Sequence, residues 1–203
     1  MIIKRVCSGI IASNTYLVGD EDGVILIDVG ADKEDIFKMV DETGLTPKMV
    51  LLTHYHIDHI MNLNEVRDRY GISAAIHRID ASAVADMHRN GARLFRVSKI
   101  IKPAEILLDS EQTLKFGSIS YRIIHTAGHT AGSICILSEN ALFTGDTLFR
   151  RSIGRTDLGD GDFDKLISSI KEKILPLGDN ITIYPGHGDQ STIIEERVKN
   201  PFL

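Results

Sequence analysis

Three histidines and one aspartate stand within six positions of the first third of the chain, in the segment Thr-His-Tyr-His-Ile-Asp-His at 53–59. Neutral imidazole nitrogens and carboxylate oxygens are the ligands that proteins commonly offer to zinc and related metals. A spacing of two positions brings side chains together on an extended or looped backbone, whereas helical zinc motifs space their histidines one turn apart. The segment therefore predicts a metal site formed by His54, His56, Asp58 and His59.

Three later segments repeat this arrangement, since each is an apolar run followed by small residues and a potential ligand. The runs at 121–124, 141–144 and 181–184 are typical of strands, and loops at strand ends are where a rigid scaffold presents functional groups. We expect these strand ends to meet at one edge of the fold. Seven side chains would then converge, namely His54, His56, Asp58, His59, His129, Asp146 and His187.

Seven ligands exceed the four that one tetrahedral zinc takes. Two metals that share a carboxylate would use all seven, at a separation of roughly 3.5–4 Å. Such a pair holds a bridging water whose pKa falls from about 15.7 toward 7, so that hydroxide is available as a nucleophile at neutral pH. The pattern therefore predicts metal-assisted hydrolysis that needs no serine or cysteine nucleophile.

The elements that must position these ligands alternate irregularly between strands and helices. Hydrophobic spacing predicts strands at 2–6, 10–18, 24–28, 48–53, 73–77, 112–116, 118–124, 133–137, 141–144 and 181–184. It predicts helices at 32–44, 60–70, 79–90 and 163–174, and a last helix that begins at Thr192, whereas 94–110 has no clear pattern. Because runs of adjacent strands occur in each half, two packed sheets with helices outside fit better than one doubly wound parallel sheet.

The composition is that of an ordinary globular protein, with 43% hydrophobic and 25% charged residues among 203. This length predicts a single domain over 1–203. The net charge of −5 argues against wholesale nucleic-acid binding. The first residues contain no apolar stretch typical of a signal peptide, and no run approaches the roughly 20 residues that span a bilayer. We therefore expect a cytoplasmic protein that binds neither nucleic acid nor membrane.

Four of these segments together resemble the metallo-β-lactamase-fold hydrolases, and most of all their glyoxalase II-like branch, the hydroxyacylglutathione hydrolases. They are Thr-His-Tyr-His-Ile-Asp-His, His-Thr-Ala-Gly-His-Thr, Gly-Asp-Thr-Leu-Phe and Tyr-Pro-Gly-His-Gly. The resemblance covers nearly the whole chain. It implies an α+β fold, a four-layer αββα sandwich of two mixed β-sheets flanked by helices, with a dimetal site at one edge.

The resemblance also allots the ligands. It implies that His54, His56 and His129 bind one metal, that Asp58, His59 and His187 bind the second, and that Asp146 bridges them. Two divalent metal ions are expected, zinc first, although iron and manganese also accept these ligands. Asp58 and Asp146 are the predicted catalytic carboxylates, and Asp58 has a second possible role as a base when only one metal is bound.

Several positions depart from the family pattern. Ala127 stands where the family often has proline, and Met61 and Asn62 stand where it often has glycines. The lysine and tyrosine of its glutathione clamp correspond to Arg155 and Asp157. We expect Arg155 to anchor an anionic substrate tail, because guanidinium binds carboxylates in a bidentate manner. Hydrolysis of a small-molecule thioester is predicted, with the acyl group, the thiol and the oligomeric state left open.

Other residues of interest are given plainer roles. His125 precedes the ligand His129 by four positions and is expected to lie outside the ligand set, while His77 and His88 are interpreted as ordinary surface or packing residues. Asp28 follows a buried strand, and it is either a plain loop residue or a partner for the second ring nitrogen of a ligand histidine.

Other functions are alternatives to thioester hydrolysis. A persulfide dioxygenase-like oxidoreductase with one iron shares the Gly-Arg-Thr-Asp segment at 154–157, and phosphodiester hydrolases share the fold. A true β-lactamase is not expected, because the resemblance gives that site no bridging aspartate. A metal-binding scaffold without chemistry is disfavoured because the ligand set is complete.

Overall fold

The strand β3 (Gly23–Ile27) shows how the molecule is layered in the computed structural model, which describes residues 1–203. Val24 and Leu26 pack against helices, whereas Ile25 and Ile27 pack against the opposite sheet. Successive side chains of a strand point to opposite faces, so a fully buried strand must be covered on both sides. The sheet that contains β3 is therefore an inner layer.

Two six-stranded sheets form the middle of the molecule, and both are mixed. The first has the order β1 (Ile2–Ser8), β2 (Ser13–Asp20), β3, β4 (Pro47–Leu51), β5 (Ser73–His77) and β6 (Ile106–Leu108). The second has the order β14 (Ser191–Thr192), β13 (Thr182–Pro185), β10 (Ala141–Gly145), β9 (Ile134–Ser138), β8 (Ile119–His125) and β7 (Thr113–Phe116). A small hairpin joins β11 (Leu148–Phe149) and β12 (Ser152–Ile153).

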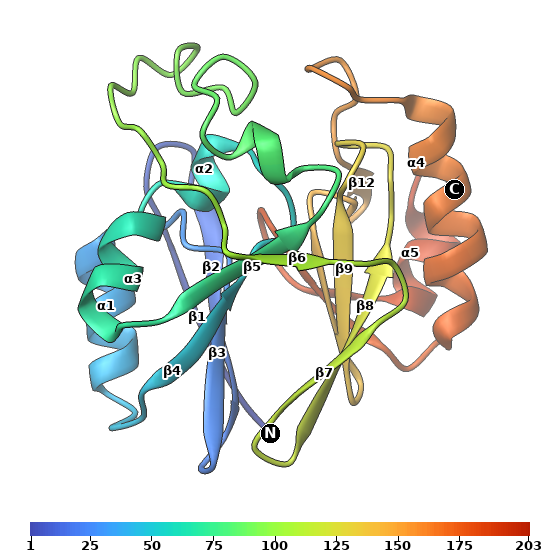
Figure 1. Ribbon diagram of the computed structural model, residues 1–203. Coiled ribbons are helices and arrows are strands. Elements are labelled where there is room, and N and C mark those ends of the chain that lie inside the picture. The colour runs from blue at the N-terminus through green and yellow to red at the C-terminus, as the bar shows by residue number, and fades with distance from the viewer.

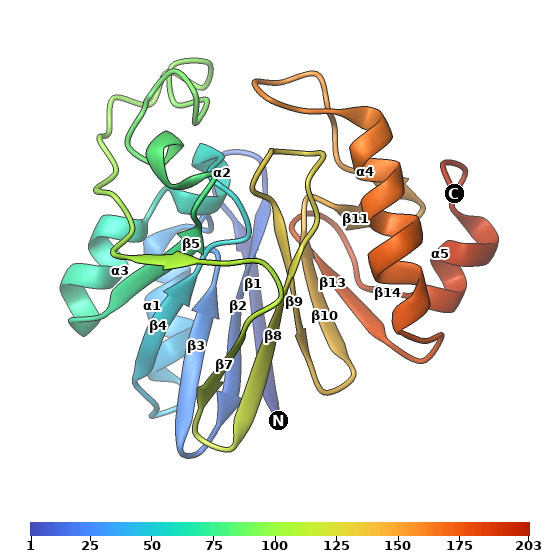
Figure 2. The same cartoon turned by 45° about the vertical axis from the view of Figure 1, so that its right-hand side comes forward.

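Helices cover the outer face of each sheet, as Figures 1 and 2 show. The first sheet is covered by α1 (Lys33–Asp41), α2 (Ile57–Ile60) and α3 (Leu63–Tyr70). The second is covered by α4 (Phe163–Ser169), its continuation as a π-helical turn (Ile170–Ile174) and a 3₁₀ turn (Leu175–Leu177), and α5 (Ile193–Lys199). A third apolar cluster lies between the sheets and includes Tyr16, Tyr121 and Phe143. This confirms the predicted αββα sandwich.

Local signals account for several element ends. The hydroxyl of Thr192 accepts a hydrogen bond from the backbone N–H of Glu195, which confirms the predicted start of the last helix. Gly71 ends α3 in the left-handed conformation, with φ of 64°. No helix combines the length and the apolar character needed to cross a bilayer.

The predicted helix at 79–90 is wrong, because the structure has only a 3₁₀ turn at Ala81–Ala83 followed by further turns. Side chains take over the hydrogen bonds that a helix would make. Asn90 donates to the carbonyl of Val84, and the carboxylate of Asp80 is engaged by the β8–β9 loop. Such local competition disfavours helix for Asp and Asn.

The predicted strand at 10–18 begins later, at Ser13. Residues 9–12 form a turn in which Gly9 and Ala12 have positive φ, and Ile10 and Ile11 are exposed there. Their β-branched side chains imitate a strand, but the backbone of the turn cannot continue a sheet.

Strand ends meet at one edge of the sandwich, as predicted. The backbone N–H of Ile134 donates to the carbonyl of Thr53 at 2.9 Å, which joins β9 to the end of β4. The N–H of Asn14 donates to the carbonyl of Gly186 at 2.7 Å, which joins β2 to the end of β13. The two sheets are thus tied together where the loops carry the candidate ligands.

Candidate metal centre

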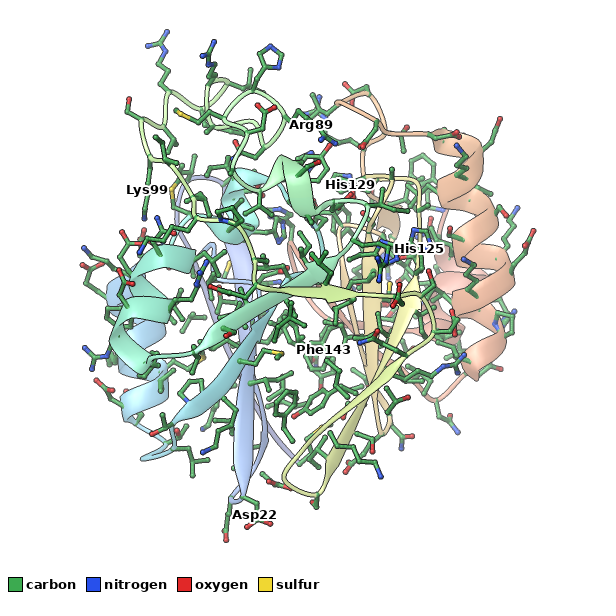
Figure 3. All side chains as sticks on the ribbon, viewed as in Figure 1. Asp22, Arg89, Lys99, His125, His129 and Phe143 are labelled. Carbon is green, nitrogen blue, oxygen red and sulfur yellow. The ribbon has the colours of Figure 1, made fainter.

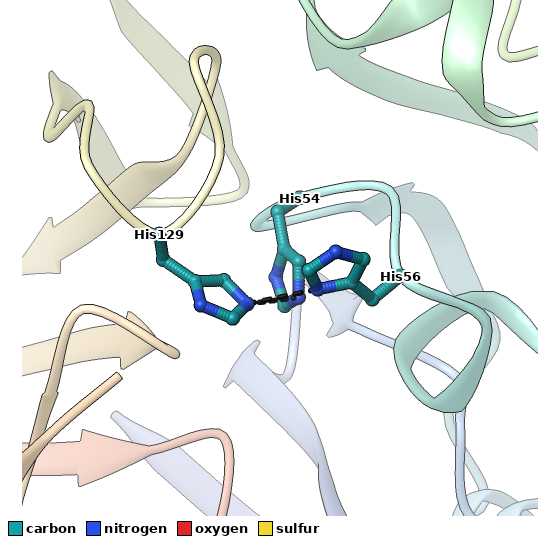
Figure 4. A group of neighbouring side chains, drawn as sticks. All are labelled: His54, His56 and His129. Atoms are coloured by element: carbon teal, nitrogen blue, oxygen red, sulfur yellow. Dashed lines mark hydrogen bonds between the residues drawn. The ribbon is translucent and has the colours of Figure 1, made fainter. Parts of the chain in front are cut away.

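All seven predicted ligands lie in one cluster at this edge. Their ligand atoms fall into overlapping sets, within each of which the atoms lie no more than 4.8 Å apart. The first group is His54 with His56 and His129, the second group is Asp58 with His59 and His187, and a further set of His54, His59 and Asp146 connects the two. Figure 4 shows the first group, with the three rings directed toward a common point. The side chain of His187 is the most exposed of the seven, at 24%.

The backbone approaches the cluster closely at the β13 end, where only glycine fits. A Cβ added to Gly186 would lie 2.3 Å from Oδ1 of Asp146 and 2.7 Å from Cε1 of His59. The Pro-Gly-His segment therefore brings His187 to the cluster while leaving room for the neighbouring ligands.

Hydrogen bonds assign the free nitrogens of the first group. Nδ1 of His129 lies 2.7 Å from the carbonyl oxygen of Arg155, so it carries the proton and donates. Nδ1 of His54 donates to the hydroxyl of Thr53 at 3.0 Å, because that hydroxyl itself donates to Asp28. The Nε2 atoms of His54 and His129 therefore both present lone pairs, and they face each other at 3.2 Å. A cation between them removes this repulsion.

The imidazoles of the first group also have the protonation state that a metal needs. Burial, with His59 and His129 next, lowers the pKa of His54 well below its usual value. Burial and the neighbouring His129 lower the pKa of His56 to about 4. Both rings are therefore neutral at pH 7, as metal ligation requires.

The second group attracts positive charge more strongly. His59 donates Nδ1–H to Asp28 at 2.8 Å, and its Nε2 lies 3.2 Å from Oδ1 of Asp146 and 3.3 Å from Oδ2 of Asp58. Burial lowers the pKa of His59, but the surrounding carboxylates outweigh burial and raise the pKa well above its usual value. His187 adds its Nε2 at 3.1 Å from Oδ2 of Asp58. The position therefore binds a proton or, in its place, a metal cation.

Asp146 lies between the two groups. Its Oδ1 is buried and makes no hydrogen bond, although Nε2 of His59 lies 3.2 Å away, and its Oδ2 lies 3.6 Å from Nε2 of His129. Burying a carboxylate oxygen without a hydrogen bond costs free energy, so a cation bound beside this atom would stabilise the cluster. Oδ2 lies equally far, 3.6 Å, from Nε2 of His187, so this carboxylate contacts both groups, as a bridging carboxylate would.

Asp28 orients ligands of both groups. It accepts from His59 directly and from the backbone N–H and the hydroxyl of Thr53, which in turn accepts from His54. The structure thus confirms the predicted contact between Asp28 and the ring of a candidate ligand histidine. The sequence did not reveal the intermediary role of Thr53, although Thr53 stands beside the ligand in the same segment.

The remaining candidates lie elsewhere. His125 stacks on His77 with ring centroids 4.3 Å apart and donates its Nε2–H to the carbonyl of Ala131 at 2.9 Å, so it lies outside the cluster, as expected. His88 lies at the rim of the adjoining cavity. The guanidinium of Arg155 forms two 2.7 Å hydrogen bonds to Asp157, and its role toward a substrate stays a prediction.

A buried carboxyl outside the cluster was missed by sequence reasoning. Asp80 is fully buried and accepts from the hydroxyl of Thr130 at 2.6 Å and from the N–H of Gly132 at 2.7 Å. Burial raises the pKa of Asp80 to about 7, although these hydrogen bonds oppose the shift. Asp80 thus fastens the loop that carries His129, and an isolated aspartate gives no sequence signal for such a contact.

Two cavities flank this part of the molecule. One of about 290 Å³ is lined by four of the clustered ligands, His56, Asp58, His129 and Asp146. A larger one of about 620 Å³, beside β1 and β13, contains none of the seven. The smaller cavity is therefore the one that adjoins the cluster. Figure 3 places His129 and Arg89 at this end of the molecule and Asp22 at the opposite end.

Three solved structures are similar over nearly the whole chain. The crystal structure of BLEG-1 B3 metallo-beta-lactamase has 38% identity and a TM-score of 0.93, covering 100% of this chain and 99% of that one. TTHA1623 in a di-iron-bound form has 30% identity and a TM-score of 0.89, covering 98% and 100%. ETHE1 from Myxococcus xanthus has 29% identity and a TM-score of 0.84, covering 99% and 84%.

Sequence relatives agree with this likeness. The probable metallo-hydrolase YqgX of Bacillus subtilis is 35% identical, covering 98% of this chain and 96% of its own length. The hydroxyacylglutathione hydrolase GloC of Haemophilus influenzae is 35% identical, covering 91% and 89%. The family model of the metallo-beta-lactamase superfamily matches residues 9–187. The chain therefore belongs to the metallo-beta-lactamase superfamily.

Proposed function

We propose that the chain is a binuclear metallohydrolase that cleaves a small-molecule acyl thioester, with zinc as its expected metal. The observation that carries the proposal is the set of seven converging ligands, in which lone pairs of His54 and His129 face each other and Oδ1 of Asp146 is buried without a hydrogen bond. This donor set fits two cations of the zinc type.

The chain's own residues supply the framework of the reaction. His54, His56 and His129 would hold one cation and Asp58, His59 and His187 the other, with Asp146 between them. When bound, the two cations would activate water at neutral pH and polarise the carbonyl under attack. Neighbouring histidines outweigh burial and hold the pKa of Asp58 below its usual range, so this side chain serves as an ionised ligand.

Support for a thioester comes from the 35% identity with a relative named as a hydroxyacylglutathione hydrolase. The related di-iron structure makes iron the main alternative to zinc. A persulfide dioxygenase-like reaction needs one iron, whereas the second ligand group here offers three further donors. The net charge of −5 gives no support to a phosphodiester substrate of nucleic-acid type.

β-Lactam hydrolysis is the second candidate. It is favoured by one observation, the 38% identity and TM-score of 0.93 with a structure described as a B3 metallo-beta-lactamase. The central Asp146 argues for the thioester instead, as the sequence resemblance implies.

The test is to measure bound metals, then to assay that preparation with lactoyl-glutathione, acetyl thioesters, a β-lactam and a phosphodiester. Oxygen uptake with a persulfide is measured in parallel. We expect thioester turnover that a chelator removes and zinc restores. Metal-loaded protein that consumes oxygen with the persulfide, or that hydrolyses only the β-lactam, would overturn the proposal.

A further inference from the structure

The cavity of about 290 Å³ beside the metal centre has an apolar wall as well as ligands. Four apolar side chains line it: Ile11, Leu94, Phe95 and Leu158. They come from three loops, namely the β1–β2 turn, the long segment between β5 and β6, and the segment between β12 and α4. Figures 1 and 2 show the last two loops rising at the same end of the molecule.

Three of these side chains, Ile11, Leu94 and the half-buried Leu158, lack a place in any apolar core. Ile11 is 44% exposed and Leu94 is 65% exposed, and neither belongs to one of the three core clusters. Isolated exposed apolar residues are common on proteins. Here they converge on one cavity that also contains Asp58 and Asp146, so a substituent bound at the centre would cover them.

The cationic side chains of the same cavity already have partners. Arg155 is bonded twice to Asp157. Arg89 donates to Ser82 at 2.9 Å, lies 3.5 Å from Asp160 and stacks over the ring of Tyr55 at 5.6 Å. Each guanidinium therefore stands beside a carboxylate, and these pairs offer little net attraction to an anionic tail.

Resting on the proposed function, we infer that the substrate carries an uncharged apolar substituent next to its thioester carbonyl, and that Leu94 and Ile11 select for it. The cavity volume is at the lower end of small-molecule sites, which suits a short alkyl or aryl group. The substituent belongs either to the acyl group or to the thiol. A charged glutathionyl tail is not what this wall recognises.

Two substrate series show whether the apolar substituent belongs to the acyl group or to the thiol. The acyl chain is lengthened from acetyl to hexanoyl on N-acetylcysteamine, and separately the acetyl group is kept while the thiol changes from N-acetylcysteamine to glutathione or benzyl mercaptan. In one series kcat/KM rises about two- to fourfold for each added methylene or its equivalent. Leu94→Ser and Ile11→Ser flatten that rise, so that the ratio of kcat/KM between the longest and the shortest ester falls toward one. Flat series, or a preference for the glutathione ester, would overturn the inference.

A matched control lies in the same loop, since Ile100 is 70% exposed and does not line the cavity. Ile100→Ser should keep the full chain-length dependence. A binding measurement separates this inference from the proposed function, because 2-butanone and 2-octanone keep the carbonyl and cannot be hydrolysed. Calorimetry should show 2-octanone binding at least about tenfold tighter to metal-loaded protein, with the difference lost in Leu94→Ser. Equal affinities would refute the apolar site even if thioesters are turned over, and absent turnover with unequal affinities would refute only the thioester reaction.

Discussion

Asp28 sets the direction of two ligand imidazoles. Its carboxylate accepts from Nδ1 of His59 and from the hydroxyl of Thr53, and that hydroxyl accepts from Nδ1 of His54. One buried side chain therefore presents an Nε2 lone pair to each half of the centre. Partners of this kind typically matter about 10- to 100-fold for metal affinity.

Asp28→Asn should therefore weaken zinc binding by about 10- to 100-fold, because both oxygens of Asp28 accept hydrogen bonds and one of them is replaced by an NH2 group, which cannot accept. A chelator competition titration measures this. Asp32→Asn is the matched control, since that exposed side chain makes no cap hydrogen bond. Equal zinc affinity in the two variants would show that Asp28 does not act on the ligands.

Asp80 gives a pH-dependent prediction. Its folded pKa of about 7 exceeds the unfolded value of about 3.9, so between these pH values the folded state binds more protons. The free energy of unfolding should therefore fall as the pH rises from 4 to 7. Asp80→Asn removes this dependence and should gain up to roughly 3 kcal/mol on the parent protein between pH 5 and pH 8.

Urea unfolding measured at pH 5 and at pH 8 checks this. The control is Asp22→Asn, because the Asp22 side chain is exposed. The control should follow the pH profile of the parent protein. If Asp80→Asn followed the same profile as well, burial of the Asp80 carboxyl would have no energetic consequence.

Elements with strong hydrophobic periodicity were predictable, and elements decided by side-chain hydrogen bonds were not. The stripe of α4 and the capping threonine of α5 are local signals that no tertiary contact overrules. In contrast, the segment at 79–90 has helical spacing, but Asp80 and Asn90 bond outside any helix. Contacts with the β8–β9 loop, which lies about 50 residues away in sequence, determine its irregular path.

The β13 end supplies the prediction for an element. Gly186→Ala places a Cβ against Asp146 and His59, so we expect a loss of about 1–3 kcal/mol in unfolding free energy together with weaker metal binding. Gly23→Ala is the matched control, because a Cβ there meets no atom closer than 3.4 Å. Urea denaturation of the metal-free proteins compares them, and an equal effect of both substitutions would contradict the close approach at Gly186.

The sandwich as a whole followed from the sequence because the ligand segments, the mixed element order and the family resemblance all agreed. The structure confirms the layers and brings the seven predicted side chains together. The apolar wall of the cavity could not be predicted from the sequence, because Ile11, Leu94 and Leu158 come from three irregular loops. Apolar residues in such loops carry no periodicity, so only the folded arrangement shows that they share one cavity with the ligands.

The central claim is that this cluster binds two cations at once. Elemental analysis of protein loaded with zinc and freed of loosely held ions tests it most directly. We expect about two zinc ions per chain, and about one in His187→Ala, because the second group then lacks a donor. One ion or fewer in the parent protein at saturating zinc, or an unchanged count in the variant, would contradict the account.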